Sequence, residues 1–385
     1  MDYKPKAYSI IFARSLYALN WFDIAPALKY ISIDLNINVI KIGLVTTSFY
    51  IGLALFQLVG GSLAHRIGNL VVSVTGLTIL GLAGIFSGLS GNFIELSVSR
   101  FMAGAGSALF FSPALGIISD IVPVDRYGSY VSVYNGAFSF GAGTGIFAFG
   151  YLDTVSGWRI SLVIGGALLL IADLAMFLMI RGGNTKVRRP MKELITAVKK
   201  PEIWILPVVT VGSAISETIM GQLFVYYLEE YRHFPAITAS AAGSFFLFVG
   251  LPGGFISAYI IRRYSKKIQV ASLLAVMGLI FFLVPFEVNI IEILTTLFAF
   301  SVLSIYGFSY LYMEASMINK SAVSFSLSIV NFVQMMISSA IPYLYTYAIY
   351  SISINAGWYL LGVISLVPAL FLIRLKMPDH SKAKA

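Results

Sequence analysis

The sequence contains no cysteine, which excludes disulfide bonds, thiolate chemistry and cysteine-based metal sites. It also lacks a Walker loop, so chemistry driven by ATP is not expected. Histidine is scarce: His65, His233 and His380 fall on two predicted loops and the C-terminal tail, too far apart to form one catalytic centre. We therefore expect no enzymatic activity, no bound metal and no cofactor.

Charged residues are also rare. They make up 11% of the 385 residues, whereas 58% are hydrophobic and the mean hydropathy is +0.87. Soluble globular proteins carry about 25% charged residues, so this chain is solvated by lipid. A helix that crosses the bilayer needs about 20 mostly apolar residues, and we expect an all-α integral membrane protein. Twelve segments are suitable: residues 8–31, 42–64, 69–91, 94–118, 128–152, 158–180, 203–228, 236–261, 268–287, 291–313, 323–349 and 355–375.

The formal net charge is +9, and its placement tells more than its size. With the N-terminus in the cytoplasm and twelve alternating spans, most basic residues, Arg14 included, fall on the cytoplasmic side. This positive-inside pattern predicts a multi-pass protein of the cell (plasma) membrane with both termini cytoplasmic. We expect no cleavable signal peptide, because the first apolar segment runs on as a full span without a small-residue cleavage site. The basic charge is therefore a topology signal, and we expect no nucleic-acid partner. The exceptions lie outside or within a span: Lys29, Lys41, Arg159, Arg232 and Arg100.

Three short patterns occur twice along the chain. The offsets between the copies are 193, 197 and 200 residues and rise in chain order, as expected after a duplication with small insertions. In so apolar a chain, two parallel halves predict a transport protein whose substrate site lies between them. The pairs are residues 60–63 with 253–256, 92–96 with 289–293, and 157–159 with 357–359.

The duplication predicts an N-terminal six-helix bundle (residues 1–180) and a C-terminal one (residues 203–376). A cytoplasmic linker (residues 181–202) joins them, and a cytoplasmic tail (residues 377–385) follows. Apolar residues recur in the linker at helical spacing opposite lysines. This pattern predicts an amphipathic helix on the membrane surface, and a merely solvated linker is the alternative. The apolar positions are Met191, Leu194, Ile195 and Val198, and the lysines are Lys192, Lys199 and Lys200.

Two motifs in the first half resemble those of the major facilitator superfamily. Residues 61–68 (Gly-Ser-Leu-Ala-His-Arg-Ile-Gly) are similar to its G-x-L-a-D-R-x-G element, and residues 100–106 are similar to its R-x-x-x-G-x-G element. Pro123, Arg126 and Gly128, with the Gly-Trp-Arg run at residues 157–159, fit its other landmarks. The resemblance implies two pseudo-symmetric six-helix bundles in which spans 1, 4, 7 and 10 line a central cavity.

The first motif departs from the family pattern at its charged positions. His65 stands where the family has an acid, and Asn69 and Leu70 replace the usual basic pair. The resemblance places Asp120 at the cytoplasmic end of span 4. A carboxylate at a helix C-terminus needs a cation because the helix dipole disfavours it there. We expect a cytoplasmic gate in which Asp120 pairs with Arg66, helped by His65; alternatively, Arg66 is only a topology anchor.

Four ionisable residues fall within predicted spans, where each costs roughly 2.5–3.5 kcal/mol unless it has a partner or a function. Asp23 and Arg100 lie at similar depths, so we expect them to pair and to act as a proton switch, although a static pair is the alternative. Glu217 is the repeat equivalent of Asp23, whereas Leu297 stands opposite Arg100. Glu217 could bind a proton, a cation or a cationic group, or serve only as a structural hydrogen-bond partner. Asp173 belongs to a peripheral span, where bonding to a neighbouring helix is expected.

Polar residues on the cavity-side spans predict a small-molecule site with apolar walls. We expect a secondary active transporter that moves a small organic solute by alternating access, coupled to protons through Asp23, and working as a monomer. Symport is favoured, because the glycine-rich run of span 5 lacks the proline typical of the family's antiporters. Drug or metabolite antiport, then uniport, and a membrane sensor remain open. The cavity residues would be Tyr17, Asn20, Asn135, Gln222, Tyr306, Tyr310, Asn331 and Gln334.

Overall fold

A computed structural model describes residues 3–181, 200–263, 267–318 and 323–372. Within these ranges the chain is almost entirely helical and contains no strand. Most of the predicted helices agree with the observed ones to within little more than one helical turn at each end, but the ninth was predicted to reach residue 287 and α13 ends at Phe281. The amphipathic helix predicted in the linker lies outside the described residues.

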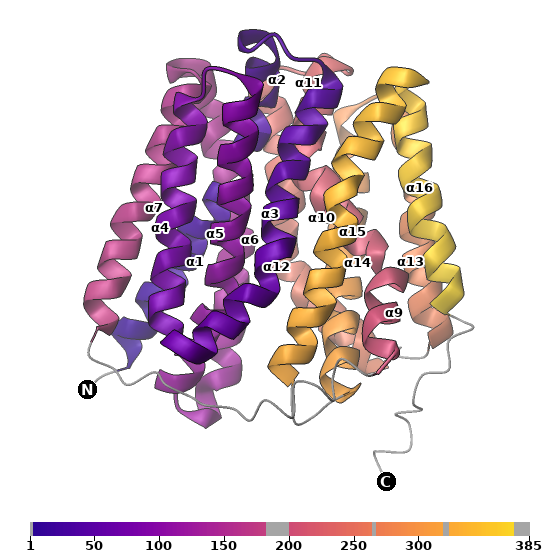
Figure 1. Cartoon of the computed structure of the whole chain (residues 1–385). Helices are drawn as coiled ribbons and strands as arrows, with labels where there is room; N and C mark the ends of the chain where they lie inside the picture. Colours follow the sequence, from indigo (N-terminus) through magenta and orange to yellow (C-terminus); the bar gives the residue numbers. More distant parts are fainter. Residues whose placement is uncertain (1–2, 182–199, 264–266, 319–322, 373–385) are drawn as a thin grey trace.

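The first half of the chain forms one bundle, drawn in indigo to magenta in Figure 1. Its first span is broken at Asp23, so that two helices replace one. Its helices are α1 (Lys4–Phe22), α2 (Ile24–Asp34), α3 (Val39–Ile67), α4 (Asn69–Leu89), α5 (Phe93–Ile121), α6 (Val124–Ser156) and α7 (Trp158–Ile180).

The second half forms the other bundle, drawn in red to yellow in Figure 1. Its first span is also interrupted: it bends by 48° near Thr210 and contains a π-helical turn, η1. Its elements are α9 (Glu202–Val209), α10 (Val211–Thr218), η1 (Ile219–Leu223), α11 (Phe224–Glu230), α12 (Ala236–Arg263), α13 (Lys267–Phe281), η2 (Val284–Phe286), α14 (Ile290–Ile318), α15 (Val323–Ser351) and α16 (Ile354–Phe371).

Among the described residues, nine helices are long and apolar enough to cross a membrane, or ten when the bent pair from Glu202 to Glu230 counts as one span. The broken pair α1–α2 and the more polar α6 supply the two remaining predicted spans. The two halves meet along α3 with α15 and along α6 with α12. Below, the end where α1 begins is called the inner end and the opposite end the outer end, following the predicted topology.

The repeated Asn-x-x-Glu pattern has a local structural cause. Asn92 Oδ1 accepts hydrogen bonds from two backbone N–H groups of the first turn of α5, both at 3.0 Å, and Glu95 accepts one from the residue before Asn92 at 2.7 Å. Asn289 and Glu292 make the equivalent contacts at the start of α14. These reciprocal caps satisfy N–H groups that a helix start leaves without partners. The duplication thus conserves two helix starts at the outer end.

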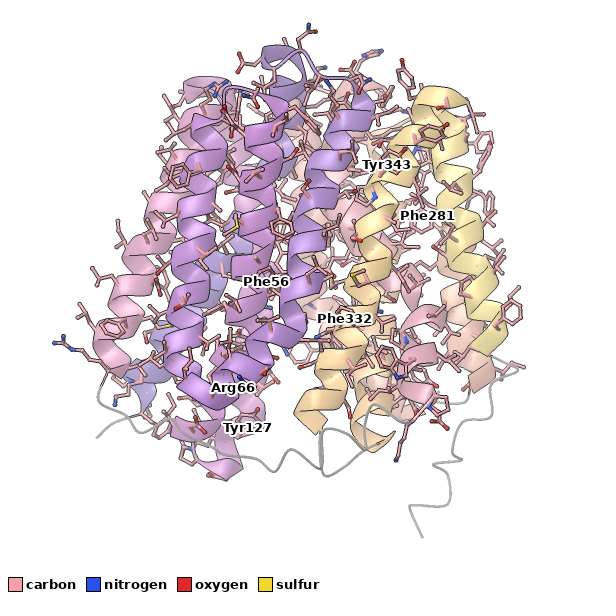
Figure 2. All side chains as sticks on the ribbon, in the orientation of Figure 1. Phe56, Arg66, Tyr127, Phe281, Phe332 and Tyr343 are labelled. Atoms are coloured by element: carbon pink, nitrogen blue, oxygen red, sulfur yellow. The ribbon has the colours of Figure 1, made fainter. Side chains whose placement is uncertain are left out.

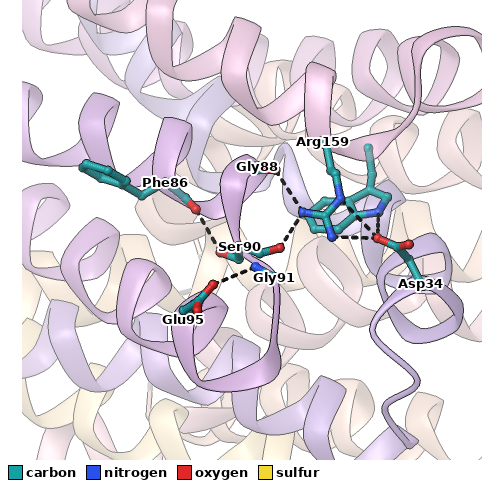
Figure 3. A network of polar contacts seen from close by, with 8 residues as sticks. Asp34, Phe86, Gly88, Ser90, Gly91, Glu95 and Arg159 are labelled. Atoms are coloured by element: carbon teal, nitrogen blue, oxygen red, sulfur yellow. Dashed lines mark hydrogen bonds and ion pairs between the residues drawn. The ribbon is translucent and has the colours of Figure 1, made fainter.

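A polar network ties three helix ends together at the outer end of the first half (Figure 3). Arg159 donates from Nη2 to Asp34 Oδ2 at 2.8 Å, and its Nη1 donates to the carbonyls of Gly88 and Ser90. Trp158 Nε1 donates to the same carboxylate oxygen at 3.2 Å. An arginine at the C-terminus of α4 satisfies carbonyls that the helix cannot bond itself. The network therefore fixes α2, α4 and α7 relative to one another.

Candidate substrate and coupling site

The break in the first span brings Asp23 and Arg100 together. Arg100 Nη1 lies 3.8 Å from Asp23 Oδ1, and both side chains are at most 1% exposed. Arg100 also donates from Nη2 to the Trp21 carbonyl at 3.5 Å, and its guanidinium lies 5.0 Å from the ring centre of Phe49. Both Asp23 carboxyl oxygens lack a hydrogen-bond partner. The predicted pairing is thus confirmed, as a loose ion pair in a dry environment.

The carbonyl of Trp21 connects this pair to the other half of the protein. Gln222, in the π-helical turn η1, donates from Nε2 to that carbonyl at 2.8 Å. Gly221 lies so close to Phe22 that an added Cβ would be 2.4 Å from the ring. Arg100 and Gln222 therefore share one acceptor at the end of α1. The broken helices of the two halves meet at the position of Asp23.

Glu217 is the penultimate residue of α10, which ends at Thr218 directly before the π-helical turn, a kind of distortion that is frequent at functional sites. The guanidinium of Arg14 acts electrostatically on its carboxyl group. The buried Tyr50 of α3 is within electrostatic range of both Glu217 and Arg100. Two acids and two arginines therefore lie close to the contact between the halves.

Arg14 is the functional candidate that sequence reasoning missed. Counting it among the cytoplasmic residues was wrong, because its side chain is only 4% exposed inside the bundle. Its guanidinium lies 4.5–4.9 Å from the ring centres of Tyr17, Phe111, Tyr134 and Phe138. A usable signal was present, since Arg14 and Tyr17 are three residues apart and so share one helix face.

Several predicted cavity residues lie buried where the two halves meet or in the C-terminal half. Tyr17 donates to the Ser107 carbonyl at 3.4 Å, and Gln222 bonds across the halves as described. Gln334 donates from Nε2 to the hydroxyl of Thr210, at the bend of span 7, at 3.3 Å. Asn331 accepts a hydrogen bond from the Tyr312 hydroxyl at 2.8 Å. Two further predicted residues are fully buried in α14: Tyr306 and Tyr310.

Of the other two predicted cavity residues, Asn20 lies elsewhere, and the position of Asn135 in the cavity stays a prediction. Asn20 donates from Nδ2 to the carbonyls of Leu16 and Gly165, both at 3.0 Å, so it faces α7 inside the first bundle. Asn135 is exposed on α6. Asn20 and Asn135 share the polarity of the others, but helix rotation turns Asn20 away from the second half. We therefore leave Asn20 out of the proposed site.

The inner end of the first half carries the residues of the predicted gate. Asn69 Nδ2 donates to Asp120 Oδ2 at 3.3 Å, and Asp120 makes further interactions. Figure 2 shows Arg66 at the inner end of α3, where its side chain is exposed. The side chain of His65 lies outside the described part of the chain. The pairing of Arg66 with Asp120 stays a prediction.

The peripheral acid is bonded as predicted. Asp173 of α7 accepts a hydrogen bond from the Thr78 hydroxyl of α4 at 2.7 Å. Both helices belong to the first bundle and lie away from α10–α11. Asp173 therefore provides a buried carboxyl group outside the candidate site.

The two halves are joined at the outer end, where α2 and α11 lie side by side (Figure 1). Lys29 of α2 donates to the Glu229 carbonyl at 2.9 Å, and its ammonium group lies 3.6 Å from a Glu230 carboxyl oxygen. Two buried acids, Asp153 of α6 and Glu229, interact electrostatically beside this contact. Ionisable groups thus join α2 to α11 at the outer end.

The gap between α6 and the second half widens from the outer to the inner end. A Cβ added at Gly150 would lie 2.2 Å from Ser240 Oγ, and one at Gly143 would lie 2.9 Å from the Phe248 ring. Further inward the corresponding distance is 3.4 Å at Gly136, and at Gly128 no atom of the described residues lies within 4 Å. The α3–α15 contact widens in the same direction: the distance is 2.0 Å to Thr346 at Gly43 and 3.9 Å to Ser328 at Gly61. At these glycines the two halves therefore approach each other more closely near the outer end than near the inner end.

Comparison with known proteins identifies the family. Residues 10–319, most of the chain, match the family described as Major Facilitator Superfamily. The chain therefore belongs to this superfamily, and its fold is the twelve-helix arrangement of two bundles that the sequence predicted. The family is one of transporters and not of enzymes.

Curated relatives match only part of their own length. A probable sphingolipid transporter, spinster homolog 1 of Arabidopsis thaliana, is 29% identical over 33% of this chain and 26% of that protein. The quinolone resistance protein NorA of Staphylococcus aureus is 22% identical over 63% of each chain.

Solved structures match the whole fold. A bacterial homolog of the human lysosomal transporter Spinster, in an inward-facing and occupied conformation, has a TM-score of 0.78 at 15% identity, covering 96% of this chain and 95% of that one. A D-xylose–proton symporter has a TM-score of 0.77 at 14% identity and covers both chains completely. At such identities the likeness concerns the fold.

Proposed function

We propose that this protein is a proton-coupled secondary transporter, a symporter that moves a small organic solute across the plasma membrane by alternating access. The observation that carries the proposal is the dry Asp23–Arg100 pair at the break between α1 and α2. An isolated charge there would be costly, so the charge state of Asp23 depends on Arg100. The protein works as a monomer, with both termini in the cytoplasm.

The Asp23–Arg100 pair lies where a change in its charge can alter a contact between the two halves. When Asp23 is ionised it holds Arg100, which in turn reaches the Trp21 carbonyl. When Asp23 is protonated this attraction is lost, and the contact between Trp21 and Gln222 of the other half changes with it. A proton on Asp23 thereby shifts the equilibrium between outer-closed and outer-open states. Such a shift requires different interactions in the two states, and the pair supplies them.

Uptake into proteoliposomes with an imposed pH gradient tests the coupling. Organic acids, amines, sugars and quinolones serve as solutes, and a pH-sensitive dye in the lumen reports proton movement. We expect Asp23→Asn to abolish accumulation driven by the gradient, because the neutral amide cannot release a proton. The same variant is expected to retain solute exchange without a gradient, since exchange needs only binding and reorientation.

Asp173→Asn is the matched control, because it removes a buried carboxyl group from the first bundle outside the site. We expect it to accumulate solute like the unmodified protein. Undiminished gradient-driven accumulation by Asp23→Asn would falsify the proton switch. Loss of both accumulation and exchange would assign Asp23 to structure or solute binding instead.

Antiport is the alternative, and one comparison favours it. The partial similarity to a quinolone resistance protein fits export of drug-like molecules in exchange for protons. The two directions differ in the sign of the coupled proton movement: solute addition carries protons with the solute in symport and against it in antiport. The luminal dye distinguishes them in the same experiment.

A further inference from the structure

Arg14 lies in a cage of aromatic rings that does not neutralise it. Four ring centres lie 4.5–4.9 Å from its guanidinium carbon, contributed by α1, α5 and α6. Cation–π contacts offset part of the desolvation cost of a buried guanidinium, at about 0.5–2 kcal/mol each. The rings supply no carboxylate acceptor, although the Tyr17 hydroxyl shares a hydrogen bond with Arg14.

Two of the three guanidinium nitrogen atoms lack hydrogen-bond partners. Arg14 Nε and Nη1 are buried and have no hydrogen-bond acceptor. Among the described residues, no acid forms an ion pair with Arg14 within 4.0 Å. Buried charged groups are normally paired and hydrogen-bonded, so an open pair of donors in a dry site indicates that an acceptor is missing.

The unfilled donors lie near the second half of the protein. Arg14 acts electrostatically on Glu217 of α10 and on Tyr312 of α14, and Tyr312 is bonded to Asn331 of α15. A ligand held by Arg14 would therefore also lie close to polar groups of the C-terminal half. The carboxyl group of Glu217 lies nearby and, among the described residues, forms no ion pair with Arg14 within 4.0 Å.

We propose that Arg14 binds the acidic group of an organic anion, such as a carboxylate, sulfonate or phosphate, at the contact between the two halves. A guanidinium donates charge-assisted hydrogen bonds to such groups, and Nε and Nη1 of Arg14 are the donors that lack an acceptor. The surrounding rings offer apolar contact to the organic part of the solute. The proposal names the substrate class of the transporter and so rests on the proposed function.

Equilibrium binding to the purified protein in detergent tests this site with 2-naphthoate as the probe, followed by calorimetry. Its neutral amide, 2-naphthamide, has nearly the same shape and apolar surface. We expect the unmodified protein to bind the carboxylate at least about tenfold more tightly than the amide, a difference of about 1.4 kcal/mol. Arg14→Gln is expected to remove this preference and to weaken naphthoate binding by at least about tenfold.

Two further variants separate the site from general effects. Arg14→Lys keeps the positive charge but replaces the planar guanidinium with an ammonium group. We therefore expect its affinity for naphthoate to lie between those of the unmodified protein and Arg14→Gln. Arg126→Gln removes an exposed arginine at the inner end and is expected to bind naphthoate like the unmodified protein. Because no proton gradient is used, the result is independent of the Asp23 switch.

Three outcomes would overturn the proposal. The first is equal binding of naphthoate by Arg14→Gln and the unmodified protein. The second is equal binding of naphthoate and naphthamide by the unmodified protein. The third is no binding by the unmodified protein of naphthoate, benzenesulfonate or phenyl phosphate. Thermal unfolding shows whether Arg14→Gln and Arg14→Lys are folded. If both variants unfold at the normal temperature and both bind naphthoate with a reduced preference over naphthamide, the result supports the anion site.

Discussion

The two halves share a scaffold but hold it together by different interactions. In the first half, Trp158 and Arg159 bind Asp34 through hydrogen bonds and charge. In the second half, the repeat partner Trp358 packs among aromatic rings. Its ring centre lies 4.8 Å from that of Tyr227 and 5.1 Å from that of Tyr345. Duplication therefore preserved the position of the tryptophan, while its environment changed from polar to aromatic.

The same difference extends to the centre of the molecule. Arg100 is buried against Asp23 in the first half, whereas the repeat places the fully buried Leu297 at the equivalent position in the second. Arg14, Asp23 and Arg100 all belong to the first half, and Glu217 to the second. Charge chemistry is thus concentrated on one side of the contact between the halves.

The largest effect on the unfolding free energy is expected when Arg100 of the first half is replaced by leucine, the residue at the equivalent position of the second half. Arg100→Leu leaves Asp23 buried without its partner, so we expect a loss of about 3–5 kcal/mol of unfolding free energy. The double variant Asp23→Asn with Arg100→Leu removes both charges and should recover much of this loss. Denaturant unfolding in detergent measures both. Equal destabilisation of the single and the double variant would show that the ion pair does not couple these residues.

A smaller effect on the unfolding free energy is expected from a substitution at the outer end of the first half. Arg159→Tyr installs the residue that the second half carries at this position, Tyr359. Because the Arg159–Asp34 pair is partly exposed, we expect a loss of about 1 kcal/mol, which shrinks in concentrated salt. Thermal unfolding at low and high ionic strength provides the measurement. A loss that is insensitive to salt would assign the effect to the carbonyl contacts instead.

The smallest effect concerns Glu287, which stands where the first half has Ser90. Burial raises the pKa of this loop carboxyl group, although the nearby charge of Arg232 offsets part of the rise. The unfolded chain then releases its proton at lower pH than the folded protein. Stability therefore falls as pH rises from the ordinary glutamate pKa to the raised one, and it stays lower above.

Glu287→Ser removes this loss. We expect the variant to gain stability relative to the unmodified protein as pH rises through that window, and the difference to be constant below it. Thermal unfolding on both sides of the window measures the change. A stability difference that does not vary with pH would contradict the assignment of the titration to Glu287.

Features set by short stretches of sequence could be predicted, and those set by helix rotation could not. Hydropathy located the spans, and the Asn-x-x-Glu pattern marked two helix starts because a capping box needs only four residues. The depth of Asp23 and Arg100 along their helices follows from residue counting. Asn20, by contrast, faces α7, since which way a residue points depends on how its helix packs against its neighbours.

The sequence by itself determined the twelve spans, the duplication and the family, because apolar length, repeated motifs and charge bias are properties of the chain. Only the tertiary structure decided that Arg14 lies inside an aromatic cage, that Gln222 bonds to the Trp21 carbonyl, and that Lys29 bonds to the Glu229 carbonyl across the halves. These contacts join residues far apart in the chain. Their existence depends on how α1, α6 and α10–α11 pack across the two halves, which no local pattern specifies.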